Sequence, residues 1–180
     1  MTTVYCIIRN TIGPDSSWFW TMVQGIVVSA SAVLIYRQLK AQHFGNMLGA
    51  LTTLDDRWAT EDMLKARAKL CLKYGTNDLK IDEQTGCVLD FFEQMGLYLK
   101  KRAFTKDVIW EFYSYNVKYY WAIAEPLIQE FRSSEKDQTY YRWFEWLAKQ
   151  MMEEDKSIKL PYSALTNDQI IKFISGEVSK

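Results

Sequence analysis

The chain has 180 residues, enough for one folded domain in addition to a membrane anchor. Aromatic side chains make up 15% of the residues, which argues against disorder and supplies material for a packed core. The formal net charge is zero, so no overall positive field attracts nucleic acid, and we expect no stable DNA binding.

The first 17 residues are too few to form a folded unit by themselves. Their last five residues, Gly13 to Ser17, are turn-forming and capping residues, which indicates that a helix begins directly after them. Residues 1–17 are therefore predicted to be a separate N-terminal segment.

The stretch Trp18–Tyr36 contains nineteen residues without a charge. As an α-helix it has a length of about 28 Å, close to the hydrocarbon core of roughly 30 Å in a bilayer. Trp18 and Trp20 at one end and Tyr36 at the other suit the depth of lipid headgroups. The alternative is a buried core helix, but such a helix normally keeps one polar stripe, and this one is apolar all round. We predict a transmembrane helix over residues 18–36.

Basic residues flank this helix on its C-terminal side. Arg37 and Lys40 follow it, and no acidic residue appears before Asp55. Because cytoplasmic flanks carry an excess of Lys and Arg, residues 37–180 are predicted to be cytoplasmic and residues 1–17 to lie on the other side of a bacterial inner membrane. A cleaved signal peptide is disfavoured, since the segment before the apolar run is long and nearly uncharged.

Small and polar side chains occur within the apolar segment at helical spacing. Gly25 and Ser29 share a face, with Ala32 one turn further, and small residues permit a second helix to approach closely. Gln24 needs a hydrogen-bond partner or water if it lies in hydrocarbon. These features predict a homo-oligomer, and a single tolerated glutamine is the alternative. The candidate pore-lining or helix-association residues are Thr21, Gln24, Gly25, Val28, Ser29, Ser31 and Ala32.

Periodicity and capping signals predict only helices in the rest of the chain. Apolar residues at steps of three and four extend the first helix to Trp58, so the anchor and the first cytoplasmic helix form one rod. Thr60 and Thr166 are predicted N-caps. The fold class is all-α, a transmembrane helix that continues into a cytoplasmic helical bundle. Further helices are predicted at about 60–74, 83–102, 106–131 with a kink at Pro126, 134–155 with a cap at 134–137, and 166–176.

The aromatic clusters at residues 113–121 and 140–146 recur at helical spacing. They are predicted to pack in the core of the bundle rather than to stack on nucleic-acid bases. Trp58 and Arg67 bracket the start of the second helix and are predicted to fix it by packing and hydrogen bonds.

The only histidine, His43, lies six residues after Arg37. This spacing fits the loose R-x(4–6)-H pattern of HEPN-type ribonucleases, in which a His handles the proton of the attacking 2′-hydroxyl and an Arg stabilises the phosphate charge. HEPN sites are usually built from two copies, so Arg37 and His43 are candidate catalytic residues of an oligomer. The alternative is that Arg37 is a positively charged flank of the span and His43 an interfacial side chain. No metal-ligand cluster or phosphate loop is found in the sequence, and no cofactor or metal is expected.

Three short motifs follow the apolar segment: Trp58 to Met63 with Arg67, Val88 to Glu93, and Tyr120-Trp121 with Pro126 and Arg132. Together with that segment, over about residues 15–150, they resemble a bacterial family of unknown function with one span and a helical cytoplasmic domain. Among such proteins, Arg37, His43 and the overall length resemble the small accessory membrane proteins encoded beside type VI-B CRISPR effectors, which carry a divergent HEPN motif. The resemblance implies an oligomeric membrane pore that acts with an RNA-guided effector, or with its RNA product, in antiviral defence.

Three functions follow from these features. The first is a homo-oligomeric pore, not an enzyme, that disrupts or depolarises the membrane in CRISPR-linked defence. The second is a membrane-tethered, HEPN-like ribonuclease, and the third is a passive, membrane-anchored interaction module. The expected partners are other copies of the chain and the lipid bilayer.

Overall fold

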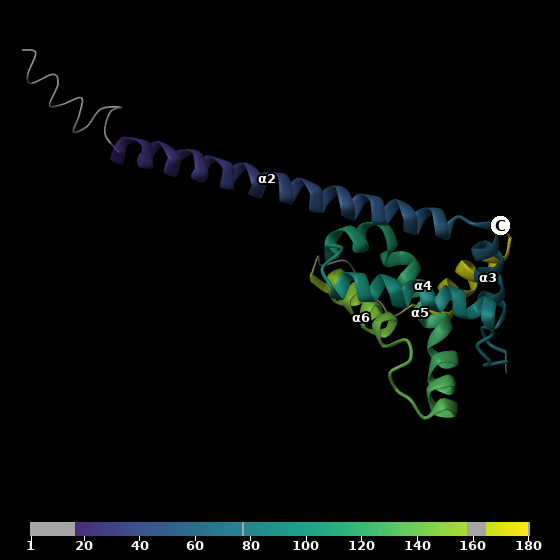
Figure 1. The fold of residues 1–180 in the computed structure, drawn as a ribbon. Helices are drawn as coiled ribbons and strands as arrows, with labels where there is room; N and C mark the ends of the chain where they lie inside the picture. Colours follow the sequence, from purple (N-terminus) through teal and green to yellow (C-terminus); the bar gives the residue numbers. More distant parts are fainter. Residues whose placement is uncertain (1–16, 77, 158–164, 180) are drawn as a thin grey trace, which may run out of the picture. The chain divides into compact units, whose positions relative to one another are not determined.

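The computed structural model describes residues 17–76, 78–157 and 165–179, and in these ranges the regular elements are helices, with no strand (Figure 1). The predicted all-α class is confirmed. The chain divides into two compact units, residues 1–50 and 51–180, which are described in turn.

Helix α2 extends from Ser17 to Trp58 over 42 residues and supplies the described part of the first unit. The predicted rod is confirmed, because the helix continues past Arg37 without a break (Figure 1). The helix is long and apolar enough to cross a membrane, and none of its apolar window is buried. A helix buried in the core of the chain, the alternative from the sequence, is not what the structure shows.

The second unit contains the end of α2 and five further helices. Two N-caps predicted from the sequence are confirmed: the Thr60 hydroxyl accepts a hydrogen bond from the Met63 N–H, and Thr166 forms a capping box with Gln169. The helices are α3 (Glu61–Leu72), α4 (Glu83–Lys100), α5 (Lys106–Glu135), α6 (Arg142–Ser157) and α7 (Asn167–Val178).

The start of α6 differs from the sequence prediction. The cap expected at residues 134–137 is wrong, because this segment ends α5, and α6 begins only at Arg142. The Ser134 hydroxyl donates back to the Phe131 carbonyl, and Lys136, in the left-handed conformation with φ 56°, closes α5. Ser, Glu and Asp occur at helix ends and in turns as well as at N-caps, so these residue types alone do not distinguish the start of a helix from the end of one.

The other predicted helix ends are correct to within a few residues. α5 passes Pro126 and ends at Glu135, four residues later than predicted. Pro126 lies inside this continuous helix, and the kink predicted there stays a prediction. α4 ends at Lys100 rather than at 102, because Arg102 adopts φ 60°.

Aromatic rings form much of the core of the second unit. Phe92 stacks on Phe144 with ring centroids 4.8 Å apart, and Trp121 meets Phe144 edge-on at 5.2 Å. Core packing of the two predicted aromatic clusters is confirmed for their inward members, whereas Tyr115 and Tyr140 are exposed. The largest fully buried side chains include Tyr120, Phe91, Phe92, Phe144, Leu70, Leu89 and Met95.

Helices α4 and α6 approach most tightly at Gly96. A Cβ atom built on Gly96 lies within 3.0 Å of the carbonyl carbon and oxygen of Trp143, which are backbone atoms that cannot move aside easily. Glycine is therefore required for this approach. Gly86, earlier in α4, gives a contrast, because its Cβ would meet only the Ile81 methyl group at 3.8 Å.

Gly96→Ala should destabilise the second unit by about 1–3 kcal/mol, because the added methyl group overpacks the α4–α6 contact. Gly86→Ala, in the same helix, should instead be neutral or stabilising by up to about 1 kcal/mol, because alanine favours a helix interior. Urea unfolding followed by circular dichroism measures both. Equal effects of the two substitutions would contradict the close approach.

A buried lysine closes the connection between α3 and α4. Lys73 Nζ donates to the Asp78 carboxylate at 2.8 Å and lies 3.3 Å from that of Asp82, the N-cap of α4. Burial on its own raises the pKa of Asp82. The hydrogen bonds from the Thr85 N–H and from Lys69 and Lys73 outweigh burial and lower this pKa from 3.8 to about 2.

The lowered pKa of Asp82 predicts a pH-dependent contribution to stability. Because the folded-state pKa lies below the unfolded value, the contribution is complete above about pH 4 and is lost as the pH falls from 3.8 towards 2. Asp82→Asn should therefore lower the free energy of unfolding most near neutral pH, with a difference from wild type that shrinks in acid. A difference that stays constant from pH 7 to pH 2.5 would show that the carboxylate charge is not the cause.

Candidate functional site

The residues predicted to line a pore or to join helices occupy one side of α2. At about 100° per residue, the seven positions fall within an arc of roughly 160° centred near Thr21 and Val28. All seven are exposed in the chain. The opposite side carries only apolar side chains, namely Met22, Val23, Ile26, Val27, Ala30, Val33 and Leu34. The helix therefore has one face that carries its small and polar side chains, together with Val28 and Ile35, and one wholly apolar face.

The polar side chains of this face differ in how the helix satisfies them. The Ser29 hydroxyl donates to the Gly25 carbonyl at 2.8 Å, so it is satisfied within its own helix. The Gln24 amide has no hydrogen-bond partner among the residues that the structure describes. An unpaired amide in hydrocarbon costs roughly 4–8 kcal/mol. Gln24 therefore needs water or a partner from outside the chain.

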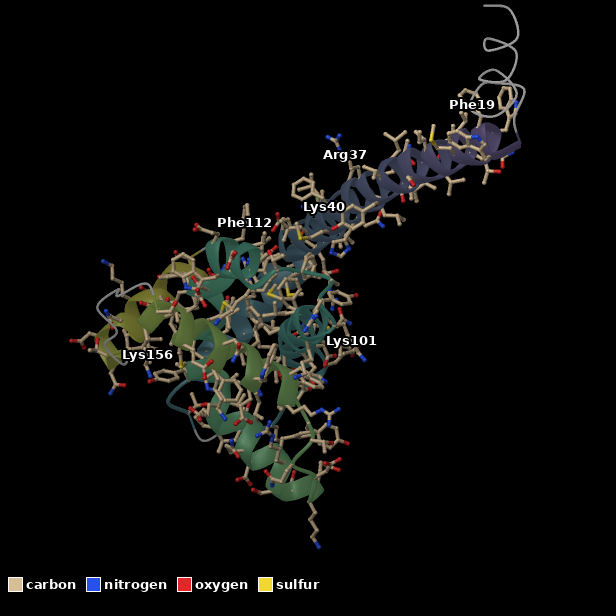
Figure 2. The ribbon with its side chains drawn as sticks, turned by 90° about the vertical axis from the view of Figure 1, so that its left-hand side faces the viewer. Phe19, Arg37, Lys40, Lys101, Phe112 and Lys156 are labelled. Carbon is tan, nitrogen blue, oxygen red and sulfur yellow. The ribbon has the colours of Figure 1, made fainter. Side chains whose placement is uncertain are left out.

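Arg37 and His43 are both exposed, and the structure does not bring them together. Six residues of α-helix separate them by about 9 Å along the axis and about 120° around it. Figure 2 shows the Arg37 side chain projecting away from α2. Within the described ranges, neither side chain forms an ion pair or a hydrogen bond. A catalytic site built from these two residues requires two copies of the chain and stays a prediction.

Helix α2 ends among aromatic rings in the second unit. The Trp58 ring centroid lies 4.7 Å from that of Phe91, 5.4 Å from that of Phe92 and 5.5 Å from that of Tyr120. The Arg67 guanidinium lies over the Trp58 ring, with Cζ 4.3 Å from the centroid, which is a cation–π contact. The expected packing of Trp58 and Arg67 at this helix start is confirmed, whereas the Arg67 Nε–H makes no hydrogen bond among the described residues. These five residues and Glu177 of α7 form the Trp58 cluster.

The Trp58 cluster contains a buried ion pair. Arg67 Nε lies 3.2 Å from Glu177 Oε2, and the two side chains are only 5% and 7% exposed. The contact is ionic, because the Arg67 Nε–H lacks hydrogen-bond geometry. The Tyr120 hydroxyl donates to the same Glu177 oxygen at 2.7 Å. Burial, with further contributions from Cys71 and from the bond to Glu177, raises the pKa of Tyr120 far above its usual value, so its hydroxyl remains a neutral donor.

Two polar contacts also hold the last turns of α2 in the second unit. The Tyr113 hydroxyl donates to the Asp55 carboxylate. Arg57 Nη1 donates to the Gln94 side chain at 2.7 Å. Burial, and then the bond to Asp55, raises the pKa of Tyr113. The C-terminal end of α2 is thus fixed by ring packing and by hydrogen bonds together.

Sequence reasoning missed Glu177, because it lies just beyond Gly176, where the last helix was predicted to end. A single glutamate in a short amphipathic helix gives no direct sign of burial. The signal that points to it is the spacing from Ile170 and Phe173, which are the other buried residues of α7 and share its face.

In the residues that the structure describes, the protein is all-helical, with one helix long and apolar enough to span a membrane and a compact unit of further helices. The chain belongs to the family described as "Domain of unknown function (DUF4760)", whose pattern matches residues 26–151. The matched segment begins inside the apolar part of α2 and includes Trp58, Arg67 and Tyr120, but not Glu177. No curated protein and no solved structure matches the chain.

Glu177→Gln should lower the free energy of unfolding by about 3–5 kcal/mol, because it leaves Arg67 buried without a counter-charge. The matched control is Glu61→Gln, which removes an exposed i,i+4 ion pair with Lys65 and should cost less than about 0.5 kcal/mol. Chemical unfolding of both variants makes the comparison. The double substitution Arg67→Met with Glu177→Leu should recover most of the loss, and a further loss would show that the pair itself contributes net stability.

Proposed function

We propose that the protein is a homo-oligomeric membrane protein whose apolar helices assemble into a pore. The observation that carries this proposal is Gln24, which lies on a face of small and polar side chains and has no partner among the described residues of its own chain. In hydrocarbon, a second copy of the helix or a water-filled lumen satisfies that amide.

The two faces of α2 support an assembly of several copies. The wholly apolar face is suited to lipid tails, and the opposite face permits close packing at Gly25, Ser29 and Ala32. The amide of Gln24 and the hydroxyls of Thr21 and Ser31 then face neighbouring helices or the lumen. A monomer in the bilayer leaves Gln24 in contact with lipid.

The flanking charges support a single span with the second unit in the cytoplasm of a bacterial cell. Arg37 and Lys40 follow the apolar segment, and Figure 2 shows both side chains on the outside of α2. In the proposed assembly the second unit provides contacts between copies and controls opening. The continuous helix from the span to Trp58 is the path through which the unit acts on the pore.

The proposed biological role is antiviral defence by membrane disruption or depolarisation. This part of the proposal is supported by the resemblance of the Arg37–His43 spacing and the chain length to the accessory proteins of type VI-B CRISPR systems. In that role an RNA-guided effector, or its RNA product, is the partner that increases opening above the leak of the assembled pore by itself.

Gln24→Leu tests the proposed pore. Full-length wild-type protein reconstituted in vesicles should release an entrapped dye. Because an interhelical polar contact in a membrane is worth about 0.6–2 kcal/mol, Gln24→Leu should weaken association about 3- to 30-fold and lower the rate of release. The matched control is Met22→Leu on the apolar face, which should release dye like wild type.

Two results contradict the proposal. One is a wild-type protein that is inserted in the vesicles but releases no dye over a wide range of protein-to-lipid ratios. The other is equal release by wild type and Gln24→Leu, which would leave the polar face of α2 without the proposed role.

A further inference from the structure

We propose that the second unit carries a binding surface for acidic phospholipid headgroups, where the end of α4 meets the start of α6. This basic tryptophan surface consists of Lys100, Lys101, Arg102, Arg142, Trp143 and Trp146. The inference rests on the proposed function only in placing the unit next to a bilayer, and it names a second contact with lipid outside the span.

Two cations from different helices share one tryptophan on this surface. Lys100 Nζ lies 6.0 Å from the ring centroid of Trp143 and 5.3 Å from that of Trp146, and Arg142 Cζ lies 4.7 Å from that of Trp143. The close approach at Gly96, one turn before Lys100, brings the two helices together here. Figure 2 shows Lys101 at the surface of the unit.

Most of the charge of this surface is not balanced by carboxylates. None of its four cations forms an ion pair within the part of the chain that the structure describes. Glu93 and Asp137 interact electrostatically with Arg142 and balance part of its charge. The positive charge of Lys100, Lys101 and Arg102 therefore remains available to an anion from outside the chain.

Helix electrostatics explain only part of this charge. Lys100 lies in the last turn of α4, where the negative end of the helix dipole favours a cation. Arg142 is the first residue of α6, where the positive end of the dipole disfavours one. The Glu93 carboxylate, which accepts a hydrogen bond from the Phe144 N–H, already supplies a negative charge at this helix end. The unbalanced positive charge of the surface therefore lies mainly at the end of α4.

Backbone strain flanks the surface on both sides. Arg102 has φ 60° and Tyr141 has φ 53°, in the left-handed region that favours glycine. The turn after α3 has Gly75 in this conformation, with φ 74°. Replacing Arg102 by glycine should therefore relieve strain in this turn while it removes one charge of the surface.

Lipid headgroups match this chemistry better than single-stranded RNA does. RNA binding relies on bases stacking on open aromatic faces, and cations already lie over the rings of Trp143 and Trp146. Headgroups need cations for phosphate and amphipathic rings at interfacial depth, and this surface offers both.

Hydrogen exchange of the full chain in lipid nanodiscs tests the proposal. Discs of phosphatidylcholine alone are compared with discs that also contain phosphatidylglycerol. Segments 97–103 and 139–147 should exchange more slowly only in the acidic discs, and high salt should remove this protection because it screens the charges.

Charge-removing variants give the matched comparison. The triple variant K100Q/K101Q/R102Q should lose the protection, since each basic residue contributes about fivefold to binding an acidic surface. K65Q/K80Q/K172Q removes the same charge elsewhere on the unit and should keep the protection. Arg102→Gly should raise the melting temperature by roughly 2–4 °C while weakening the protection, which separates binding from folding.

Three results overturn the proposal. The first is equal protection in both kinds of disc, and the second is protection that survives in K100Q/K101Q/R102Q. The third is protection that inorganic phosphate or an RNA oligonucleotide produces in neutral discs, while acidic lipid has no effect.

Failure of the chain to enter discs is a different result, because it contradicts the proposed span. In that case, exchange measured with added phosphatidylglycerol vesicles still tests the basic tryptophan surface.

Discussion

An uncharged helical segment that is not buried in its own protein has to be covered by something else. Exposure of apolar surface to water costs about 25 cal/mol per Å², and none of the apolar window of α2 is buried. Hydrocarbon meets this demand on the face that carries only apolar side chains. It does not meet the demand of Gln24 on the other face, because lipid tails offer no hydrogen bonds. Both demands are met together when several copies of the helix pack in a bilayer with their small and polar faces inward.

The second unit has the features of a folded domain in its own right. Its core is closed by stacked rings, by the glycine contact between α4 and α6, and by the buried pair of Arg67 and Glu177. The end of α2 belongs to this core, because Trp58 packs on Phe91 and carries the Arg67 guanidinium on its ring. A change in the packing of α7 therefore alters the surroundings of the last residue of α2, through Glu177 and Arg67. In the proposed pore, this contact is the one through which the second unit would act on the helix that carries the apolar segment.

Short-range signals made much of the fold predictable. The caps at Thr60 and Thr166, the apolar run and the uninterrupted rod depend on residues within a few positions of one another. The buried pair was not predictable in this way, since Arg67 and Glu177 are 110 positions apart and each charge by itself is typical of a surface. The basic tryptophan surface was missed for the same reason, because it forms only where Gly96 lets two distant helices meet.

The predicted site residues also differ in whether short-range signals are enough to place them. The arc of small and polar residues on α2 follows from helical phase alone, and one helix is enough to describe it. The pairing of Arg37 with His43 does not follow from helical phase, because a spacing of six residues places them about 120° apart on α2. A site with both residues needs the Arg of one copy and the His of another.

Both sets of residues therefore depend on the assembly of several copies. Electron microscopy of the full chain in lipid discs tests it most directly. The account predicts a closed ring with the α2 helices around its axis and Gln24 facing the lumen or a neighbouring helix, and single, separate copies inserted in the discs would contradict it.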